Sequence, residues 1–128
     1  MNDQVTPIPK DIEGKILAWR HWHSFWSFMH YGVGFIGAAL SAVVAANTEN
    51  AFLTKEWSVG LAAAAAGTTF LITALGASAK SAAFEAAARE IEKGVSLFRS
   101  DESNKGTPTK SILYDAEARG IDILNTVK

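Results

Sequence analysis

The chain of 128 residues contains no cysteine, and its positive and negative charges nearly cancel. The missing cysteine excludes disulfide frameworks, thiolate zinc sites and cysteine nucleophiles. The 12 Lys and Arg against 13 Asp and Glu leave no basic excess, so we do not expect a nucleic-acid-binding protein. We also expect no cleaved signal peptide, because the first twenty residues carry mixed charge, two prolines and no apolar stretch.

Charged residues are missing altogether from residues 21–48 and 57–79, so every Lys, Arg, Asp and Glu lies outside these two stretches. A helix that crosses a bilayer core about 30 Å thick needs roughly 20 mostly apolar residues. Residues 25–46 and 58–79 each supply that length without a charge. The sequence therefore predicts two membrane-spanning helices at these positions, with the lipid bilayer around them.

The alternative to a membrane protein is a soluble helical hairpin buried in a larger core. The rest of the chain is too polar to bury two helices that are apolar all round. Amphipathic rings prefer the level of the lipid headgroups, and they gather where each predicted span begins. These rings are Trp19, Trp22, Trp26 and Tyr31 at the first span and Trp57 at the second. Their positions favour the membrane interpretation.

The distribution of basic residues predicts the orientation. Only the ten residues 47–56, followed by Trp57 at the start of the second span, lie between the two spans, so both termini must lie on one side of the membrane. Several basic residues flank the outer ends of the two spans, whereas Lys55 stands alone between them. Because cytoplasmic segments carry the excess of Lys and Arg, both termini should lie in the cytoplasm.

Small residues recur along both predicted spans at intervals of four. Helices in lipid associate mainly through close packing, which small side chains permit. The residues expected to pack are Gly34, Gly37, Ala38 and Ser41 in the first span and Gly60, Ala64 and Thr68 in the second. The pattern suits tight pairing either within one hairpin or between subunits, and we expect a homo-oligomer.

Residues 80–128 are predicted to form a cytoplasmic tail of two helices. Apolar residues follow steps of four and three along its first part, as in a coiled-coil seam. The residues of this tail seam are Phe84, Ala88, Ile91, Val95 and Phe98. After a polar break at 101–106, Thr107 and Pro108 are typical of the start of a second helix.

The second tail helix has a seam of its own. Its members are Leu113, Ala116, Gly120, Ile123 and Val127. The two seams would bury each other if the tail folded back as an antiparallel helical pair. They would also be buried if they packed against seams of other subunits. The spacing is compatible with both arrangements. Gly94 and Gly120 each weaken a helix by up to about 1 kcal/mol relative to Ala.

Before the first span, residues 1–24 are predicted to be an interfacial segment, because Ile12, Ile16, Trp19 and His23 follow helical spacing after two prolines. The predicted fold class is thus an all-α membrane protein. It comprises this interfacial helix, a two-helix transmembrane hairpin over 25–79, and the helical tail.

Two sequence features could be taken for cofactor-binding sites, but neither has the surroundings that such a site needs. Residues 32–37 match G-x-G-x-x-G, yet the match lies inside a predicted span rather than after a strand, so helix packing explains its glycines better than a dinucleotide does. Three histidines invite a metal or haem, but the second span offers no facing histidine. His30 is the deepest ionisable group, with a possible role in a pore or as a pH sensor, against the simpler interpretation of an interfacial polar group. We expect no cofactor, no metal and no enzyme activity.

The two spans lead directly into Lys80–Phe84 (KSAAF) and then Ala87–Ile91 (AAREI). Over about residues 20–100 this arrangement resembles the SLATT superfamily of bacterial two-helix membrane effectors. The resemblance implies a multi-pass protein of the bacterial inner membrane whose hairpins oligomerise into a membrane-disrupting pore in antiviral defence. It brings no catalytic residues. Sensing would fall to a soluble partner protein that binds the tail.

Two other functions fit a small two-span protein. A phage holin commonly ends in a short, strongly charged tail, whereas this tail has two patterned helices and balanced charge. A membrane anchor or assembly subunit would use the tail to recruit a soluble partner and would form no hydrated pore. Membrane potential and growth during expression distinguish these functions.

Overall fold

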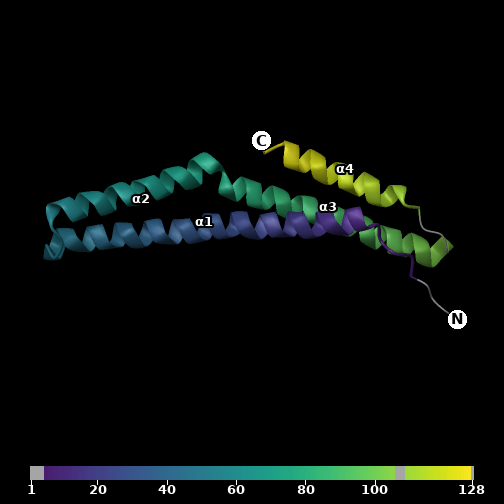
Figure 1. Cartoon of the computed structure of the whole chain (residues 1–128), viewed down its shortest axis with the longest axis horizontal. Helices are drawn as coiled ribbons and strands as arrows, with labels where there is room; N and C mark the ends of the chain where they lie inside the picture. Colours follow the sequence, from purple (N-terminus) through teal and green to yellow (C-terminus); the bar gives the residue numbers. More distant parts are fainter. Residues whose placement is uncertain (1–4, 106–108, 128) are drawn as a thin grey trace. The chain divides into compact units, whose positions relative to one another are not determined.

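A computed structural model describes residues 5–105 and 109–127, and within these ranges the chain is helical with no strand. Four helices follow one another: α1 (Lys10–Asn50), α2 (Lys55–Leu75), α3 (Ala77–Lys105) and α4 (Ser111–Asn125) (Figure 1). The predicted all-α class is confirmed. Among the described residues, α1 and the stretch Lys55–Asn104, which contains α2, are long and apolar enough to cross a membrane.

Helix α1 is one uninterrupted helix of 41 residues, which contains both the predicted interfacial helix and the first predicted span. The reason is that no proline lies within α1: the last proline before it is Pro9, and the backbone hydrogen bonds run on from Ile12, whose N–H donates to the carbonyl of Pro9 at 3.0 Å. The helix ends at Asn50, after which Ala51 takes a positive φ of 48°. Asn47 then accepts a hydrogen bond from the N–H of Leu53 at 2.6 Å and closes the turn.

Helix α2 ends at Leu75, four residues before the predicted end of the second span at Ala79. Gly76 follows with φ 57° and ψ 36°, and its N–H donates to the carbonyl of Thr73 at 3.2 Å. This left-handed conformation suits glycine and costs other residues about 1–2 kcal/mol. Helix α3 begins at the next residue, so the boundary between α2 and α3 lies at Gly76 and not after Ala79, where the predicted span ends.

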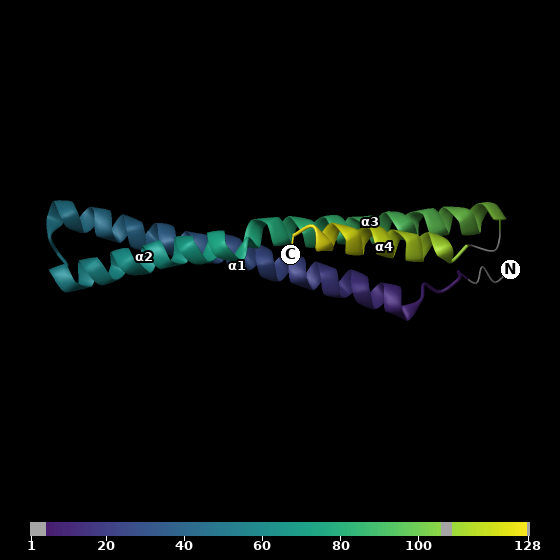
Figure 2. The ribbon, with the colours of Figure 1, turned by 90° about the horizontal axis from the view of Figure 1, so that it is seen from above.

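The chain divides into two compact units, each described on its own. The apolar unit comprises residues 25–78, that is, the second part of α1 together with α2. The charged unit joins the residues up to Ser24 with those from Ala79 onward. Within it, the first part of α1, α3 and α4 enclose one hydrophobic core (Figure 2).

The core of the charged unit is small and fully closed. Its four largest side chains without solvent exposure are Ile12, Ile91, Phe98 and Leu113. The predicted polar break at 101–106 is helical through Lys105, because polar side chains there find partners: Asp101 accepts from the N–H of Thr109 at 3.0 Å, and Glu102 pairs with Arg99 at 2.9 Å. The predicted helix start at Thr107 and Pro108 lies outside the described residues, and α4 begins at Ser111.

Candidate functional site

The apolar unit exposes its largest side chains. Phe35 on α1 is 76% exposed and Phe70 on α2 is 71% exposed, and Phe28, Tyr31 and Trp57 are exposed as well. In the most apolar window of each candidate span, only 6% of the residues are buried. A helix of a soluble core would show the opposite, since burial of apolar surface is what stabilises it there. This unit therefore needs an apolar environment beyond its own two helices.

Within the apolar unit, α1 and α2 approach each other closely at the glycines of α1. A Cβ on Gly37 would fall on the hydroxyl of Thr68, and one on Gly34 would lie 3.6 Å from the Cδ1 of Ile72. The buried Ala65 lies one turn from Thr68 on the same face of α2. Ala65, Thr68 and Ile72 are thus residues of α2 that face α1.

The other predicted packing residues lie elsewhere on the two helices. Ala38, Ser41, Gly60 and Ala64 are exposed, and a Cβ on Gly60 would meet nothing within 4 Å. Small side chains also line a groove of about 420 Å³ in this unit. Its lining residues are Ser41, Val44, Ala45, Ala62, Ala65, Ala66 and Thr69. A groove lined mostly by small side chains allows a further helix to approach closely in lipid.

The hydroxyl groups of the apolar unit bond to their own helices. Ser41 donates to the carbonyl of Gly37 at 2.9 Å, and Thr73 to that of Thr69 at 2.9 Å. Thr68 and Thr69 both donate to the carbonyl of Ala65, at 2.7 and 3.2 Å. Hydroxyls in a spanning helix can either line a hydrated path or bond to the local backbone, and this geometry corresponds to the second.

The three histidines have different surroundings. The Nδ1 of His30 is buried and has no hydrogen-bond partner in the described part of the chain, while its ring meets Tyr31 edge-on at 5.1 Å between centroids. His21 is exposed. His23, in the charged unit, contacts the backbone carbonyl of Ser81 through Nδ1 at 3.0 Å. No two of them come together as a ligand pair.

The tail seam lies in the core of the charged unit. Ala88, Ile91 and Phe98 are buried in it, and Phe84 and Val95 pack against its edge. Leu113, Ala116 and Gly120 of the second seam are buried too, and they face α3 of the same chain. The two seams therefore meet within one chain, with the start of α1 as a third helix.

Two glycines in this unit allow helices to touch, a role the sequence analysis missed. A Cβ on Gly94 would collide with the Cβ of Ala116, and one on Gly120 would lie 2.5 Å from Cζ3 of Trp19 and 3.2 Å from the carbonyl of Ala87. Trp19, expected at the membrane interface, is 8% exposed and packs here instead, because Gly120 leaves space for its ring. The signal was present for Gly120, which is a member of the second seam, whereas Gly94 only neighbours Val95 of the tail seam.

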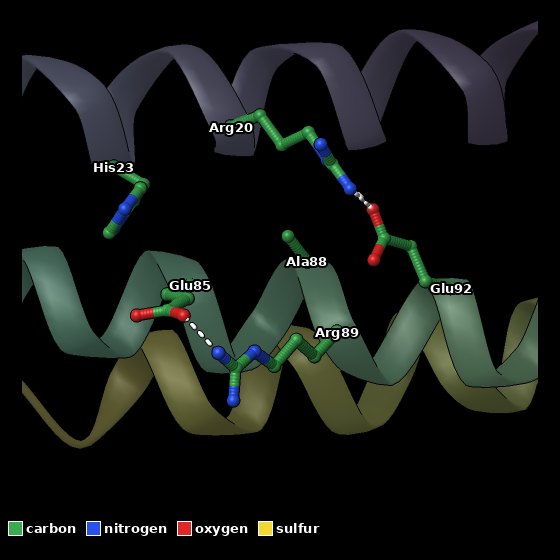
Figure 3. A pocket seen from close by; sticks show the side chains of 6 residues that line it. All are labelled: Arg20, His23, Glu85, Ala88, Arg89 and Glu92. Carbon is green, nitrogen blue, oxygen red and sulfur yellow. Dashed lines mark hydrogen bonds and ion pairs between the residues drawn. The ribbon is translucent and has the colours of Figure 1, made fainter.

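A cavity of about 280 Å³ lies between α1 and α3 of the charged unit (Figure 3). Arg20 and His23 reach from α1 toward α3, which contributes Glu85, Ala88, Arg89 and Glu92. The Nε of Arg20 donates to Glu92 at 2.7 Å, and Arg89 pairs with Glu85 one turn away. Two cations and two carboxylates thus surround an open space whose floor is the methyl group of Ala88.

Ion pairs hold the outer parts of the charged unit together. Arg99 donates to the carbonyl of Thr6 at 2.6 Å, and the N–H of Thr6 donates to Glu102 at 2.5 Å. These two hydrogen bonds hold the segment before α1 against α3. Lys15 on α1 pairs with the largely buried Glu117 on α4. Glu90 contacts both Lys93 and Arg119, and its pKa is lowered by these hydrogen bonds, Lys93 first.

The contact at Glu102 predicts a dependence on pH. Hydrogen bonds from Thr6, foremost from its side chain, and then from Arg99 lower the pKa of Glu102 below its ordinary value. A depressed folded-state pKa contributes stability that is present above the ordinary pKa and is lost as pH falls through the folded value. We expect Glu102→Gln to lower the thermal midpoint at about pH 7. On acidification toward about pH 3, the thermal midpoint of the variant should fall less than that of the wild type, because the variant has no carboxylate at this position to protonate.

Thermal unfolding followed by circular dichroism in detergent measures this effect. Glu13→Gln, which changes an exposed carboxylate in the first turn of α1, is the control. Equal acid-induced losses in the wild type and in Glu102→Gln would contradict the assignment.

Comparison with known proteins gives no relative: no protein-family model, no curated protein and no solved structure matches the chain. Among the described residues, no group of three His, Asp or Glu side chains is placed to hold a metal ion.

Proposed function

We propose that this protein is an oligomeric effector of the bacterial inner membrane that forms a pore or disrupts the bilayer. The apolar unit spans the membrane as a hairpin with both termini in the cytoplasm. The charged unit controls when copies join, and a soluble sensor protein acts on it. The resemblance to the SLATT superfamily adds the setting, which is antiviral defence.

The observation that carries the proposal is the exposure of the apolar unit's large side chains. Apolar surface left in water costs roughly 25 cal/mol per Å², and side chains such as Phe35 and Phe70 are among the largest that a protein has. The charged residues of this unit are confined to the stretch 49–56, so none lies beside these rings to offset this cost. Lipid tails remove the cost without any further protein.

Oligomerisation follows from what two helices can enclose. A hairpin of two helices has no lumen, whereas several hairpins in a ring can surround one. The α1–α2 contact uses Gly34 and Gly37 but leaves Ala38, Gly60 and Ala64 exposed. Exposed small residues give neighbouring hairpins a surface for close packing in lipid, where van der Waals contact drives association.

Control through the charged unit is supported by covalent continuity. Helix α1 passes from one unit to the other without a break between Ser24 and Phe25. Its first part is held by the core around Ile12 and by the pairing of Lys15 with Glu117. A protein that pulls α4 away from this core would act on the same continuous helix whose second part, in this proposal, enters the membrane.

Expression of the full chain in bacteria, with a potential-sensitive dye and growth as readouts, tests the proposal. We expect depolarisation and growth arrest while the cell wall stays intact. Lysis that requires a co-expressed endolysin would instead indicate a holin. An unchanged potential, with the protein present in the membrane fraction, would indicate an anchor and contradict the proposal.

A pair of variants separates membrane insertion from general damage. Phe35→Asp places a charge in the span, which costs about 2.5–3.5 kcal/mol at a helix centre, and should abolish both membrane association and depolarisation. Leu17→Asp changes another exposed apolar residue of the same helix, 70% exposed but in the charged unit, and should leave both unchanged. Loss of depolarisation in both variants would argue against the assigned spans.

A further inference from the structure

We propose that the cavity between α1 and α3 of the charged unit binds a phospholipid headgroup that carries both a phosphate and a primary ammonium group. This inference rests on the proposed membrane location of the apolar unit. The site consists of Arg20 and His23 on α1 and of Glu85, Arg89 and Glu92 on α3, with Ala88 as its floor (Figure 3). Its function is to tie the charged unit to the membrane surface.

The charges around the cavity match a zwitterion better than an anion. Arg20 and Arg89 supply two positive charges, and Glu85 and Glu92 supply two negative ones, so the lining is neutral as a whole. A phosphate accepts hydrogen bonds from guanidinium groups, and an ammonium group donates them to carboxylates. A headgroup with both groups can bind each pair of side chains without leaving a net charge in the cavity.

The present ion pairs do not prevent this binding. Arg20 and Arg89 keep most of their side chains in solvent, at 64% and 70%, so their pairs with Glu92 and Glu85 are surface pairs of small net strength. An incoming phosphate shares each guanidinium with its carboxylate instead of breaking the pair, because a guanidinium has five N–H donors.

His23 adds a directed acceptor at the inner end of the cavity. Its Nδ1 lies 3.0 Å from the backbone carbonyl of Ser81 and 3.2 Å from the hydroxyl of the same residue, and we assign the tautomer in which Nδ1 donates, because a carbonyl only accepts whereas a hydroxyl can also accept. In the neutral ring the Nε2 then has a lone pair, which suits an ammonium N–H. Quaternary ammonium groups have no such hydrogen, so the site should discriminate ethanolamine-type from choline-type headgroups.

In the proposed topology, Arg20 and His23 stand in the sequence just before the first predicted span, where headgroups are expected. The predicted span begins at Phe25. His23 lies two residues before it and Arg20 five residues before it, which corresponds to roughly 3 Å and 7.5 Å along a helix. The polar layer on each side of a bilayer core is roughly 5–8 Å thick. The exposed ring of Trp22, stacked on Phe84 at 6.2 Å between centroids, lies at the same level and suits a headgroup–tail boundary.

Lipid retention measured by native mass spectrometry tests the proposal on the full chain in detergent. The probes are phosphatidylethanolamine, phosphatidylcholine and phosphatidylglycerol with identical acyl chains. We expect the wild type to retain phosphatidylethanolamine about tenfold more than either of the others, the effect of one lost charge-assisted hydrogen-bonded contact. Equal retention of the three lipids, or a preference for phosphatidylglycerol, would overturn the proposal.

Substitutions locate the binding in the cavity. Arg89→Gln and Glu85→Gln each remove one member of a pair within a single helix, so the fold should survive, and each should lower retention of phosphatidylethanolamine about tenfold. Lys93→Gln removes the equivalent pair with Glu90 outside the cavity and is the matched control. Unchanged retention in the first two variants, with helix content preserved, would contradict the site.

Soluble compounds separate a lipid from a free phosphate. Glycerophosphoethanolamine and inorganic phosphate should compete poorly, since the acyl chains hold the lipid at this depth. Efficient competition by inorganic phosphate alone would overturn the lipid assignment. Because retention does not depend on permeabilisation, a protein that retains the lipid but leaves the membrane potential unchanged would disprove the proposed function and not this site.

Discussion

Replacement of Phe98 by alanine is expected to destabilise the charged unit by about 3–5 kcal/mol, the usual cost of removing a phenyl ring from a closed core. Phe98 is 0% exposed and lies in the same core as Ile91 and Leu113. Native domains are stable by only about 5–15 kcal/mol, so this single change takes a large share of the total. Urea unfolding followed by circular dichroism, in detergent that keeps the apolar unit dissolved, measures the loss.

Leu97→Ala is the matched control, because Leu97 is the preceding residue on the same helix but is 57% exposed. Its truncation should change the free energy of unfolding by no more than about 0.5 kcal/mol. Hydrogen exchange adds a regional readout: Phe98→Ala should raise exchange in α3, α4 and the first part of α1, and leave residues 25–46 protected. A similar destabilisation by both variants would mean that the core is not where the structure places it.

The sequence predicts the helical faces of the charged unit well because their periodicity is local. Apolar residues at alternating steps of four and three must lie on one side of a helix, and Phe84, Ile91 and Phe98 do so. The pattern says which face is buried but not what covers it. Pairing within one chain or between subunits stayed open for this reason, and the structure places α4 of the same chain there.

Trp19 and the two glycines illustrate what periodicity leaves out. A tryptophan near a span is typical of the membrane interface, and a glycine in a helix is typical of lower helix stability. In the structure Trp19 and Gly120 complement each other in volume: the missing side chain of one leaves space for the ring of the other. Such a match joins residues about a hundred positions apart, so no window along the sequence contains it.

In the apolar unit the sequence located the helices but not all their ends. The long stretches without charge indicate where apolar helices lie and about how long they are, and α1 and α2 cover most of the predicted spans. Gly76 ends α2 before the uncharged stretch does, because one residue in the left-handed conformation interrupts the helix while the composition stays apolar. His30 stays a prediction as a pore or pH-sensing residue. Its buried Nδ1, without a partner among the described residues, is the unsatisfied polar group of this unit.

Gly37→Leu is expected to separate α1 from α2 and to abolish depolarisation. A Cβ at this position would fall on the hydroxyl of Thr68, with the Thr68 Cβ at 3.4 Å and the backbone carbonyl of Ala65 at 3.8 Å. The hydroxyl already donates to that carbonyl at 2.7 Å, so it has little room to turn away. The helices must move apart by the size of the added side chain, since overpacking is relieved only by backbone shifts.

Gly60→Leu is the control for this change, because it adds the same side chain to the apolar unit where a Cβ would meet nothing within 4 Å. The chain has no cysteine of its own, so spin labels at Val44→Cys and Ala62→Cys, on the two sides of the groove, report the separation of α1 and α2 cleanly. Gly37→Leu should lengthen the label distance and Gly60→Leu should not. If Gly60→Leu alone abolished depolarisation with the label distance unchanged, the activity would depend on contacts between hairpins at the exposed face of α2. If neither variant altered distance or activity, the close approach at Gly37 would have no part in the mechanism.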